Sequence, residues 1–230
     1  MTKDIPNYCN NEDPGVVRIF IIRHGQTAEN AAKILQGHLD TDLNDVGRDQ
    51  ADKLGKYLAE DRQIKFDRVY TSDLKRCQQT LKQILTHYAE NPEIIVQPGL
   101  RERAMGVIQG MHIRAAEQYA ADHGKTSFRE FGEKPDAFQE RLTGNVLTLV
   151  KESEQDGLEN IAMISHGGSI RQLLKWLNYT EHDIHKIIVY NTSVTIIDYI
   201  KDTATFEVKR VGNTQHLGQG EFIVSDMRLR

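Results

Sequence analysis

The stretch VVRIFIIRHG, residues 16–25, decides the fold of this chain. Its first seven residues are apolar except for Arg18, which predicts a short buried strand. Arg23 and His24 follow directly, so two side chains that can bind or attack an anion come where the strand ends. Gly25 comes next, and its missing side chain lets the backbone approach a ligand closely. We therefore expect a buried strand with a reactive carboxyl end.

The same order of strand, polar residues and helix recurs along the chain. Short apolar runs predict strands at residues 66–71, 94–96 and 160–164, and further strands within 187–211 with a turn at Lys201-Asp202. Apolar residues at helical spacing predict one helix capped by Asn44, one from Asp73 onward, and others at 112–121, 136–151 and 170–177. This alternation is typical of an α/β fold with a mainly parallel sheet covered on both faces. We expect one domain, residues 16–230, preceded by a loose polar arm, residues 1–15.

The composition is that of an ordinary globular protein with a mildly acidic charge. Hydrophobic residues make up 39% and charged residues 27%, and 29 Lys and Arg stand against 33 Asp and Glu. This balance disfavours a nucleic-acid partner, so any bound anion needs a local basic pocket. The apolar runs are far shorter than the ~20 residues of a membrane helix, and we expect no membrane partner.

The two cysteines and the N-terminal residues indicate the compartment. Cys9 and Cys77 match no zinc-ligand spacing and no disulfide framework, so we expect two reduced thiols. Residues 1–14 are polar and lack the apolar segment of a secretory signal. A cytoplasmic protein is expected, and access to the nucleus stays open. The sequence offers no His-x-x-x-His pair, and we expect neither a metal nor another cofactor.

Polar side chains also follow the other predicted strands. Ser72 and Asp73 follow the second strand, and Arg76 lies one helical turn beyond Ser72. Residues 100–103, Leu-Arg-Glu-Arg, follow the third strand, and residues 165–168, Ser-His-Gly-Gly, follow the fourth. Functional sites of parallel sheets form where the carboxyl ends of the strands meet. Arginines, two histidines and one glutamate would share one pocket there, which is the composition that phosphoryl transfer needs.

Each of these residue types has a definite use in phosphoryl transfer. Arg23 and Arg76 can donate forked hydrogen bonds to phosphoryl oxygens, and a neutral His24 can attack phosphorus. His166 can add hydrogen bonds to the transferring group, and the first amides of the helix behind it can bind an anion. Glu102 can give a proton to the leaving group.

Taken singly, each residue has a plainer structural interpretation. A histidine at a strand end is often structural, and His166-Gly167-Gly168 is compatible with a simple strand-to-helix turn. Arg76 alone could be an exposed helix charge, and Glu102 between two arginines could form a surface ion pair. The joint occurrence at four strand ends is what favours the phosphoryl-transfer site.

The motifs resemble those of the phosphoglycerate mutase-like histidine phosphatases. The matching residues are 21–27 with Asn30, 71–80, 100–103 with Gly106 and Gly110, and 165–168. The resemblance implies a three-layer α/β/α sandwich and catalysis without a metal. It implies His24 as the nucleophile of a phosphohistidine intermediate, Glu102 as proton donor and then base, and His166 as a further catalytic residue. The phosphate-binding residues are expected to be Arg23, Asn30, Arg76 and Gly167.

The family divides between enzymes that return the phosphoryl group to a substrate and enzymes that pass it to water. Its mutases carry a longer insertion after the glutamate motif, with paired arginines for the substrate carboxylate. Here residues 111–134 form a short segment whose cations are not paired: Arg114, Lys125, Arg129 and Lys134. We therefore expect a phosphomonoester hydrolase of broad specificity for small phosphorylated metabolites. A phosphoglycerate mutase or a sugar-bisphosphate phosphatase of the same fold is the alternative, and a non-catalytic phosphate-binding module would have no need of Glu102.

Overall fold

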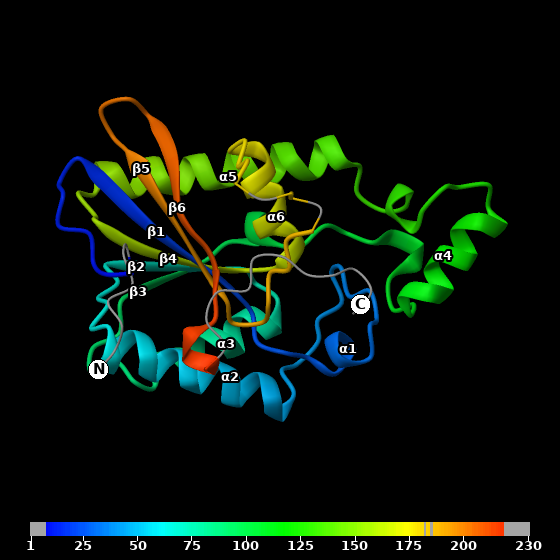
Figure 1. Ribbon diagram of the computed structural model, residues 1–230, viewed down its shortest axis with the longest axis horizontal. Coiled ribbons are helices and arrows are strands. Elements are labelled where there is room, and N and C mark those ends of the chain that lie inside the picture. The colour runs from blue at the N-terminus through cyan, green and yellow to red at the C-terminus, as the bar shows by residue number, and fades with distance from the viewer. Residues whose placement is uncertain (1–7, 182, 185, 219–230) are drawn as a thin grey trace.

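The computed structural model describes residues 8–181, 183–184 and 186–218, which form a mixed α/β fold around one sheet (Figure 1). In these residues the sheet has six strands in the order β3-β2-β4-β1-β5-β6. They are β1 (Val16–Arg23), β2 (Arg68–Thr71), β3 (Glu93–Val96), β4 (Asn160–Ser165), β5 (Val194–Ile200) and β6 (Thr205–Asn213). β1 to β4 run parallel, and β5 and β6 add antiparallel pairs at one side. The mainly parallel sheet predicted from the sequence is confirmed.

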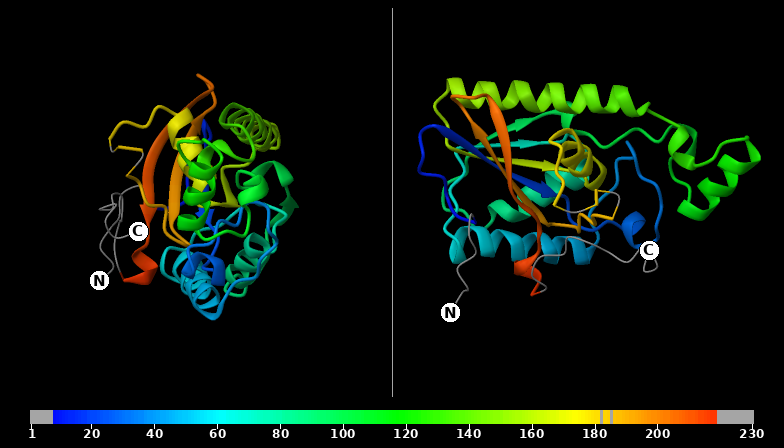
Figure 2. Two further views of the ribbon diagram at one scale, coloured as in Figure 1. Left: turned by 90° about the vertical axis from the view of Figure 1, so that its right-hand side faces the viewer. Right: turned by 45° about the horizontal axis from the view of Figure 1, so that its top comes forward.

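Helices cover both faces of the sheet (Figure 2). They are α1 (Ala28–Ala31), α2 (Asp45–Lys56), α3 (Lys75–Leu85), α4 (Ile113–Asp122), α5 (Pro135–Gln155) and α6 (Gly167–Trp176). α2 and α3 pack on one face, and α5 and α6 pack on the other, which gives the three-layer sandwich that the family resemblance implied. α1 and α4 lie beyond the carboxyl ends of the parallel strands (Figure 1). Among the described residues, no helix combines the length and apolar character that a membrane span requires.

Alternate side chains of β1 enter the two layers. Val17, Ile19 and Ile21 pack among residues of α5 and α6, while Phe20 and Ile22 pack among residues of α2 and α3. All five are at most 1% exposed. Burial on both faces fixes the register of this strand, because a slip of one residue would exchange the two sets. It therefore also fixes the point where the reactive residues leave the sheet.

Local sequence explains where two of the helices begin. The side chain of Asn44 accepts from the Gly47 amide at 2.8 Å and caps α2, as expected. The helix expected from residue 170 begins earlier, at Gly167, directly after His166. Glycine is a weak helix former, so helix propensity gave no sign of this start. The early start places the first amides of α6 beside His166.

Two expectations about irregular segments are wrong. Residues 187–193 form a loop and not a strand, and this loop buries Ile187 and Val189 in the core before β5 begins. Residues 8–15 are not a loose arm, because the ring of Tyr8 is fully buried and contacts the rings of Phe20 and Tyr57. Residues 1–7 of the expected arm lie outside the described residues.

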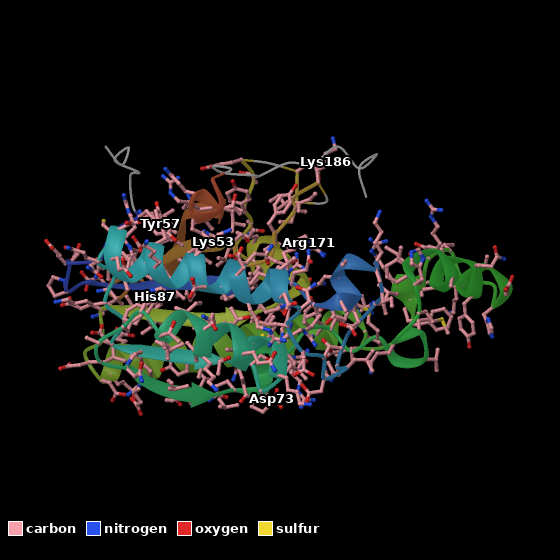
Figure 3. All side chains as sticks on the ribbon, turned by 90° about the horizontal axis from the view of Figure 1, so that it is seen from below. Lys53, Tyr57, Asp73, His87, Arg171 and Lys186 are labelled. Atoms are coloured by element: carbon pink, nitrogen blue, oxygen red, sulfur yellow. The ribbon has the colours of Figure 1, made fainter. Side chains whose placement is uncertain are left out.

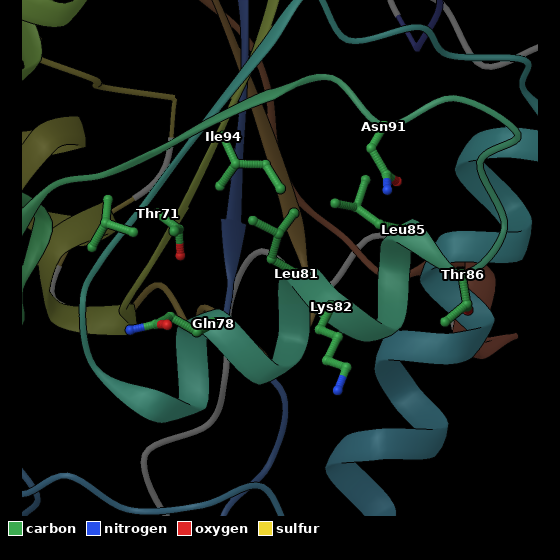
Figure 4. Close-up of a pocket in the computed structure, with 9 residues that line it drawn as sticks. Thr71, Gln78, Leu81, Lys82, Leu85, Thr86, Asn91 and Ile94 are labelled. Atoms are coloured by element: carbon green, nitrogen blue, oxygen red, sulfur yellow. The ribbon is translucent and has the colours of Figure 1, made fainter.

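An apolar pocket lies on the flank of the sheet, away from the predicted site residues. It is a hollow of about 430 Å³ between α3 and the edge strand β3 (Figure 4). Its lining includes Leu81, Leu85, Ile94 and Val96, and none of the residues predicted to bind phosphate. An anion would find few charged partners there, so the catalytic site has to be sought at the strand ends.

Candidate active site

The four predicted motifs meet at the carboxyl ends of the strands. β1 and β4 are parallel neighbours in which Arg23 pairs with Ser165, so the next residues, His24 and His166, emerge side by side. Their ring centroids are 5.3 Å apart, and the ring planes are inclined by 62°. A cavity of about 150 Å³ opens beside them. All seven predicted site residues line this inner cavity: Arg23, His24, Asn30, Arg76, Glu102, His166 and Gly167.

The ring of His24 is held in one tautomer. It is 3% exposed, and its Nδ1 lies 2.7 Å from the carbonyl oxygen of Gly25. Because a carbonyl oxygen can only accept, Nδ1 carries the proton and Nε2 keeps its lone pair. Burial, helped by the guanidinium groups of Arg76 and Arg23, holds the pKa of His24 well below its usual value. His24 is therefore a neutral imidazole with an available Nε2, the form that a nucleophile needs.

Two guanidinium groups border the inner cavity without a carboxylate ion-pair partner in the described part of the chain, and Arg76 is buried while Arg23 is half-buried. Arg23 donates to the carbonyl oxygen of Val189 at 2.5 Å, and its buried Nε has no hydrogen-bond partner there. Arg76 donates to the carbonyl oxygens of Leu39 and Gly37 at 2.6 and 2.8 Å. Burial lowers the pKa of both side chains, that of Arg23 to about 10. Two guanidinium groups that are not held in a contact ion pair form a site for an anion.

The positive charge of the site comes from arginines. In the described residues, no three His, Cys, Asp or Glu side chains gather in a way that could hold a metal ion. Planar guanidinium groups suit a phosphoryl group because they donate two parallel hydrogen bonds to its oxygens.

His166 makes hydrogen bonds within the protein through both ring nitrogens. Its Nδ1 accepts from Nε of Arg76 at 3.3 Å, and its Nε2 lies 3.1 Å from Oγ of Ser72. Burial, with Arg76 and His24 as the next causes, lowers the pKa of His166 well below its usual value, so the ring is neutral. The single N–H of this tautomer is directed at Ser72. The expected hydrogen bond from His166 to the transferring group is therefore not prepared in this arrangement, and the ring orients Arg76 instead.

Glu102 lies at the edge of the inner cavity and is held by backbone amides. Its Oε1 accepts from the amide of Arg103 at 2.9 Å, and its Oε2 accepts from the amide of Gly168 at 2.7 Å. Nε2 of His38 lies 2.8 Å from the carbonyl oxygen of Glu102 itself. These contacts keep a carboxyl group, which can give or take a proton, beside the cationic cavity.

Asn30 and Gly167 complete the wall of the inner cavity. Oδ1 of Asn30 accepts from the Thr27 amide at 3.2 Å and from Nδ2 of Asn191 at 3.3 Å, which leaves its amide nitrogen to donate to an anion. Gly167 is the first residue of α6, where backbone amides lack partners within the helix. A Cβ atom on Gly167 would lie 3.2 Å from Nε of Arg23, so its absence lets the guanidinium group sit beside the helix start.

Comparison with known proteins identifies the family. The model of the histidine phosphatase superfamily (branch 1) matches residues 19–214. The chain belongs to this superfamily. It is 58% identical to a broad-specificity phosphatase of Saccharomyces cerevisiae, with both chains covered completely. It is 30% identical to phosphoglycerate mutase-like protein 4 of Arabidopsis thaliana, with 94% of each chain covered.

Solved structures show the same fold. Phosphoglycerate mutase from Bacillus anthracis matches with a TM-score of 0.79 at 24% identity, covering 94% of this chain and 99% of that one. The prediction of a histidine phosphatase with a phosphoglycerate mutase-like fold is thus confirmed, and the chain is a phosphomonoesterase of a superfamily that acts through phosphohistidine.

A larger chamber of this histidine phosphatase adjoins the inner cavity. This outer chamber has a volume of about 420 Å³ and shares Leu35, Glu102, Met105 and Arg171 with the inner cavity. Its wall combines apolar side chains with cations, and the cations are Arg103, Arg129, Arg171 and Lys175. The chamber has room for a group attached to an anion in the inner cavity.

Sequence reasoning missed Arg171, although this residue lines both spaces. It lies four residues after Gly167, so it follows the strand end by one helical turn (Figure 3). The same spacing links Ser72 to Arg76, and a search for basic residues one turn beyond each strand end would have found it. Gly168 was missed too, because its contact with Glu102 joins segments that are far apart in the sequence.

Proposed function

We propose that this chain hydrolyses small phosphomonoesters through a phosphohistidine formed on Nε2 of His24. In this proposal Glu102 moves the proton, His166 orients Arg76, and the phosphoryl group is bound by Arg23, Arg76, Asn30 and Gly167. The position of Nε2 of His24 carries the proposal. This nitrogen has a lone pair and belongs to a cavity bordered by two guanidinium groups that form no ion pair with a carboxylate in the described residues.

In the first step, the lone pair of Nε2 forms a bond to phosphorus while the bond from phosphorus to the ester oxygen breaks. Glu102 gives its proton to that oxygen, so the leaving group departs as an alcohol and Glu102 becomes a carboxylate. Arg23 and Arg76 balance the charge on the equatorial oxygens. The hydrogen bond from Nδ1 to Gly25 stabilises the positive ring that forms during the attack.

In the second step, a water molecule attacks the phosphohistidine. The Glu102 carboxylate takes a proton from the water as the new oxygen–phosphorus bond forms. The bond between phosphorus and Nε2 breaks, and the electron pair returns to the ring. Inorganic phosphate leaves, and both His24 and Glu102 are back in their starting protonation states.

We infer that specificity is broad and that small phosphorylated metabolites, not nucleic acids, are the substrates. The inner cavity of about 150 Å³ suits a phosphoryl group, and the outer chamber takes leaving groups of varied shape. The cationic side chains of the outer chamber favour leaving groups that carry negative charge. The relative from Saccharomyces cerevisiae is named for broad specificity. A cytoplasmic location remains part of the proposal and is supported by the free thiols of Cys9 and Cys77.

Trapping of the labelled enzyme tests the nucleophile. Brief exposure to a phosphomonoester labelled in its phosphoryl group should leave an acid-labile label on the wild-type chain. His24→Ala should carry no label and lose more than about 10³-fold in kcat. His123→Ala is the matched control, because His123 is exposed and stacks on Tyr119 away from both chambers. Label on His166, or turnover by His24→Ala, would contradict the proposal.

Glu102→Gln tests the proton donor and base separately from the nucleophile. With 2,4-dinitrophenyl phosphate, whose leaving group needs no proton, the first step should proceed and labelled phosphohistidine should accumulate. Without the base, the second step should be slow. A Glu102→Gln enzyme that releases inorganic phosphate at the wild-type rate would contradict the assignment.

The fate of the phosphoryl group decides between a phosphatase and a mutase. A mutase would exchange phosphoryl groups between positional isomers faster than it releases inorganic phosphate. The proposed enzyme should release inorganic phosphate in excess over any exchange product, measured with 3-phosphoglycerate and with a sugar bisphosphate.

A further inference from the structure

The first two residues of α6 contact both the inner cavity and the carboxyl group of Glu102. Gly167 opens the helix at the wall of the inner cavity, and the amide of Gly168 donates to Oε2 of Glu102 at 2.7 Å. The carboxyl group of Glu102 also fills the space that a side chain on residue 168 would occupy. A Cβ atom there would lie 2.7 Å from Oε2 and 2.8 Å from Cδ of Glu102. Glycine at position 168 therefore permits both the hydrogen bond and the close approach.

We propose that Gly168 is a positioning residue, which holds the carboxyl group of Glu102 within reach of the ester oxygen. The proposal rests on the acid role of Glu102 given above and extends it to a residue that has no side chain. Gly167 and Gly168 are consecutive, so the phosphoryl group and the acid are placed relative to the same stretch of backbone. The distance between them is then set by the helix start and not by two independent loops.

An added methyl group at position 168 should move the acid and leave the fold intact. The three atoms nearest to such a Cβ all belong to the end of the Glu102 side chain, which can rotate away. Ordinary contact needs about 3.4 Å or more, so Cδ has to move by at least about 0.6 Å. A shift of about 1 Å in a reacting group can cost about 10²-fold in rate. Alanine also favours the helical conformation over glycine, which supports α6.

Esters with poor and good leaving groups distinguish a displaced acid from a general defect. Glycerol 2-phosphate needs a proton on its leaving oxygen, whereas 2,4-dinitrophenolate leaves without one. We expect Gly168→Ala to lower kcat/KM about 10- to 100-fold for glycerol 2-phosphate and less than about threefold for 2,4-dinitrophenyl phosphate. Because kcat/KM reports the first step with either ester, the comparison is independent of the later attack by water. Inhibition by inorganic phosphate should stay unchanged, since the arginines are not displaced.

Two other glycines provide the control and the contrast. Gly144→Ala in α5 is the matched control, because a Cβ there meets no atom within 4 Å, and it should leave both esters unaffected. Gly167→Ala places its Cβ against Arg23, so it should lower kcat/KM for both esters by the same factor. Equal losses for both esters in Gly168→Ala would overturn the proposal.

A double-mutant cycle attributes the effect to Glu102. In a Glu102→Ala background the obstructing carboxyl group is gone, so Gly168→Ala should cause no further loss. If the losses of kcat/KM from the two substitutions multiply in the double variant, the positioning role is wrong. If Glu102→Ala alone lowers kcat/KM equally for both esters, the acid role of Glu102 is wrong instead. Should Gly168→Ala not fold, Glu102→Ala has to restore folding, and failure to do so would also refute the proposal.

Discussion

His24 and His166 stay uncharged in the folded enzyme, and keeping them uncharged costs folding free energy as the solution turns acidic. Burial and the neighbouring guanidinium groups lower the pKa of His24 and of His166 well below the usual value. In the unfolded chain each histidine has a pKa of about 6.5. Below that pH the unfolded state binds protons that the folded state excludes. Stability is therefore fully present above pH 6.5 and is lost as the pH falls toward the folded-state pKa.

The size of the loss follows from this linkage. Between pH 7 and pH 5, each histidine that remains neutral in the folded state should lower the free energy of unfolding by about 2 kcal/mol. His216 adds a third such group, because burial lowers its pKa to about 4. Carboxyl groups do not contribute to this loss. Arg101 lowers the pKa of Asp73, for example, so the stabilisation from that carboxylate is lost only below about pH 4, outside the window from pH 7 to pH 5. Three histidines would then remove about 6 kcal/mol, a large part of the 5–15 kcal/mol that stabilises a typical domain.

Urea denaturation at pH 7, 6 and 5 measures this loss. The variant to compare is His24→Gln, because glutamine keeps a polar side chain but cannot titrate. Its loss between pH 7 and pH 5 should be smaller than that of the wild type by about 2 kcal/mol. Equal losses in both proteins would refute the reasoning, as would an NMR titration in which the His24 ring becomes protonated near pH 6.5.

Three further predictions concern stability. Arg18 and Asp198 form a buried two-bond ion pair between β1 and β5, with distances of 2.8 and 2.7 Å, so Arg18→Met should lower the free energy of unfolding by about 3–5 kcal/mol in urea denaturation. Replacing Asp198 by leucine in the same chain should recover most of that loss, and no recovery would contradict a buried-charge origin. Tyr8→Ala leaves a cavity at a fully buried position and should lower the free energy of unfolding by about 3–5 kcal/mol. A fall of less than about 2 °C in the Tm would show that residues 8–15 are dispensable for stability. His87 lies between Asp52 and Glu60, well apart from Arg171 (Figure 3), and these two carboxylates raise its pKa. The charged His87 therefore adds to the free energy of unfolding below about pH 6.5, and this contribution is lost as the pH rises through the raised pKa. Because both carboxylates are about half exposed, His87→Gln should lower the free energy of unfolding by at most about 1 kcal/mol at pH 5.5 and by less at pH 8.5. A larger loss at pH 8.5 than at pH 5.5 would contradict the raised pKa of His87.

The strand ends could be predicted from the sequence because their signals are local. A short apolar run that stops at a polar motif indicates both a buried strand and its carboxyl end. Parallel strands bring such ends to one edge of the sheet, so His24 and His166 could be expected to meet although 141 residues lie between them. The order of the strands was not needed for that inference. For the same reason all seven predicted site residues border one cavity.

The remaining features depend on contacts between distant segments. The loop 187–193 has the apolar pattern of a strand, and its apolar side chains pack in the core. Its backbone, however, forms hydrogen bonds with groups outside the sheet, such as that from the Arg23 side chain to the carbonyl oxygen of Val189. Tyr8 is a single aromatic residue in a polar stretch, so no periodicity marks it as buried. The hydrogen bond between Gly168 and Glu102 and the orientation of His166 toward Arg76 likewise have no local signal.

The same guanidinium groups explain why the site attracts an anion and why His24, the proposed nucleophile, is neutral. Arg23 and Arg76 are among the causes that keep His24 neutral, and both border the cavity where the phosphoryl group would lie. A carboxylate that formed an ion pair with either arginine would neutralise its charge, but it would also raise the pKa of His24 and repel phosphate. Without such an ion pair the free enzyme is less stable than a paired one would be, and a phosphoryl group that binds here pairs with both guanidinium groups. Substrate affinity and the lower stability of the free enzyme have one electrostatic cause, so stabilising the free enzyme at these two arginines has to come at the expense of turnover.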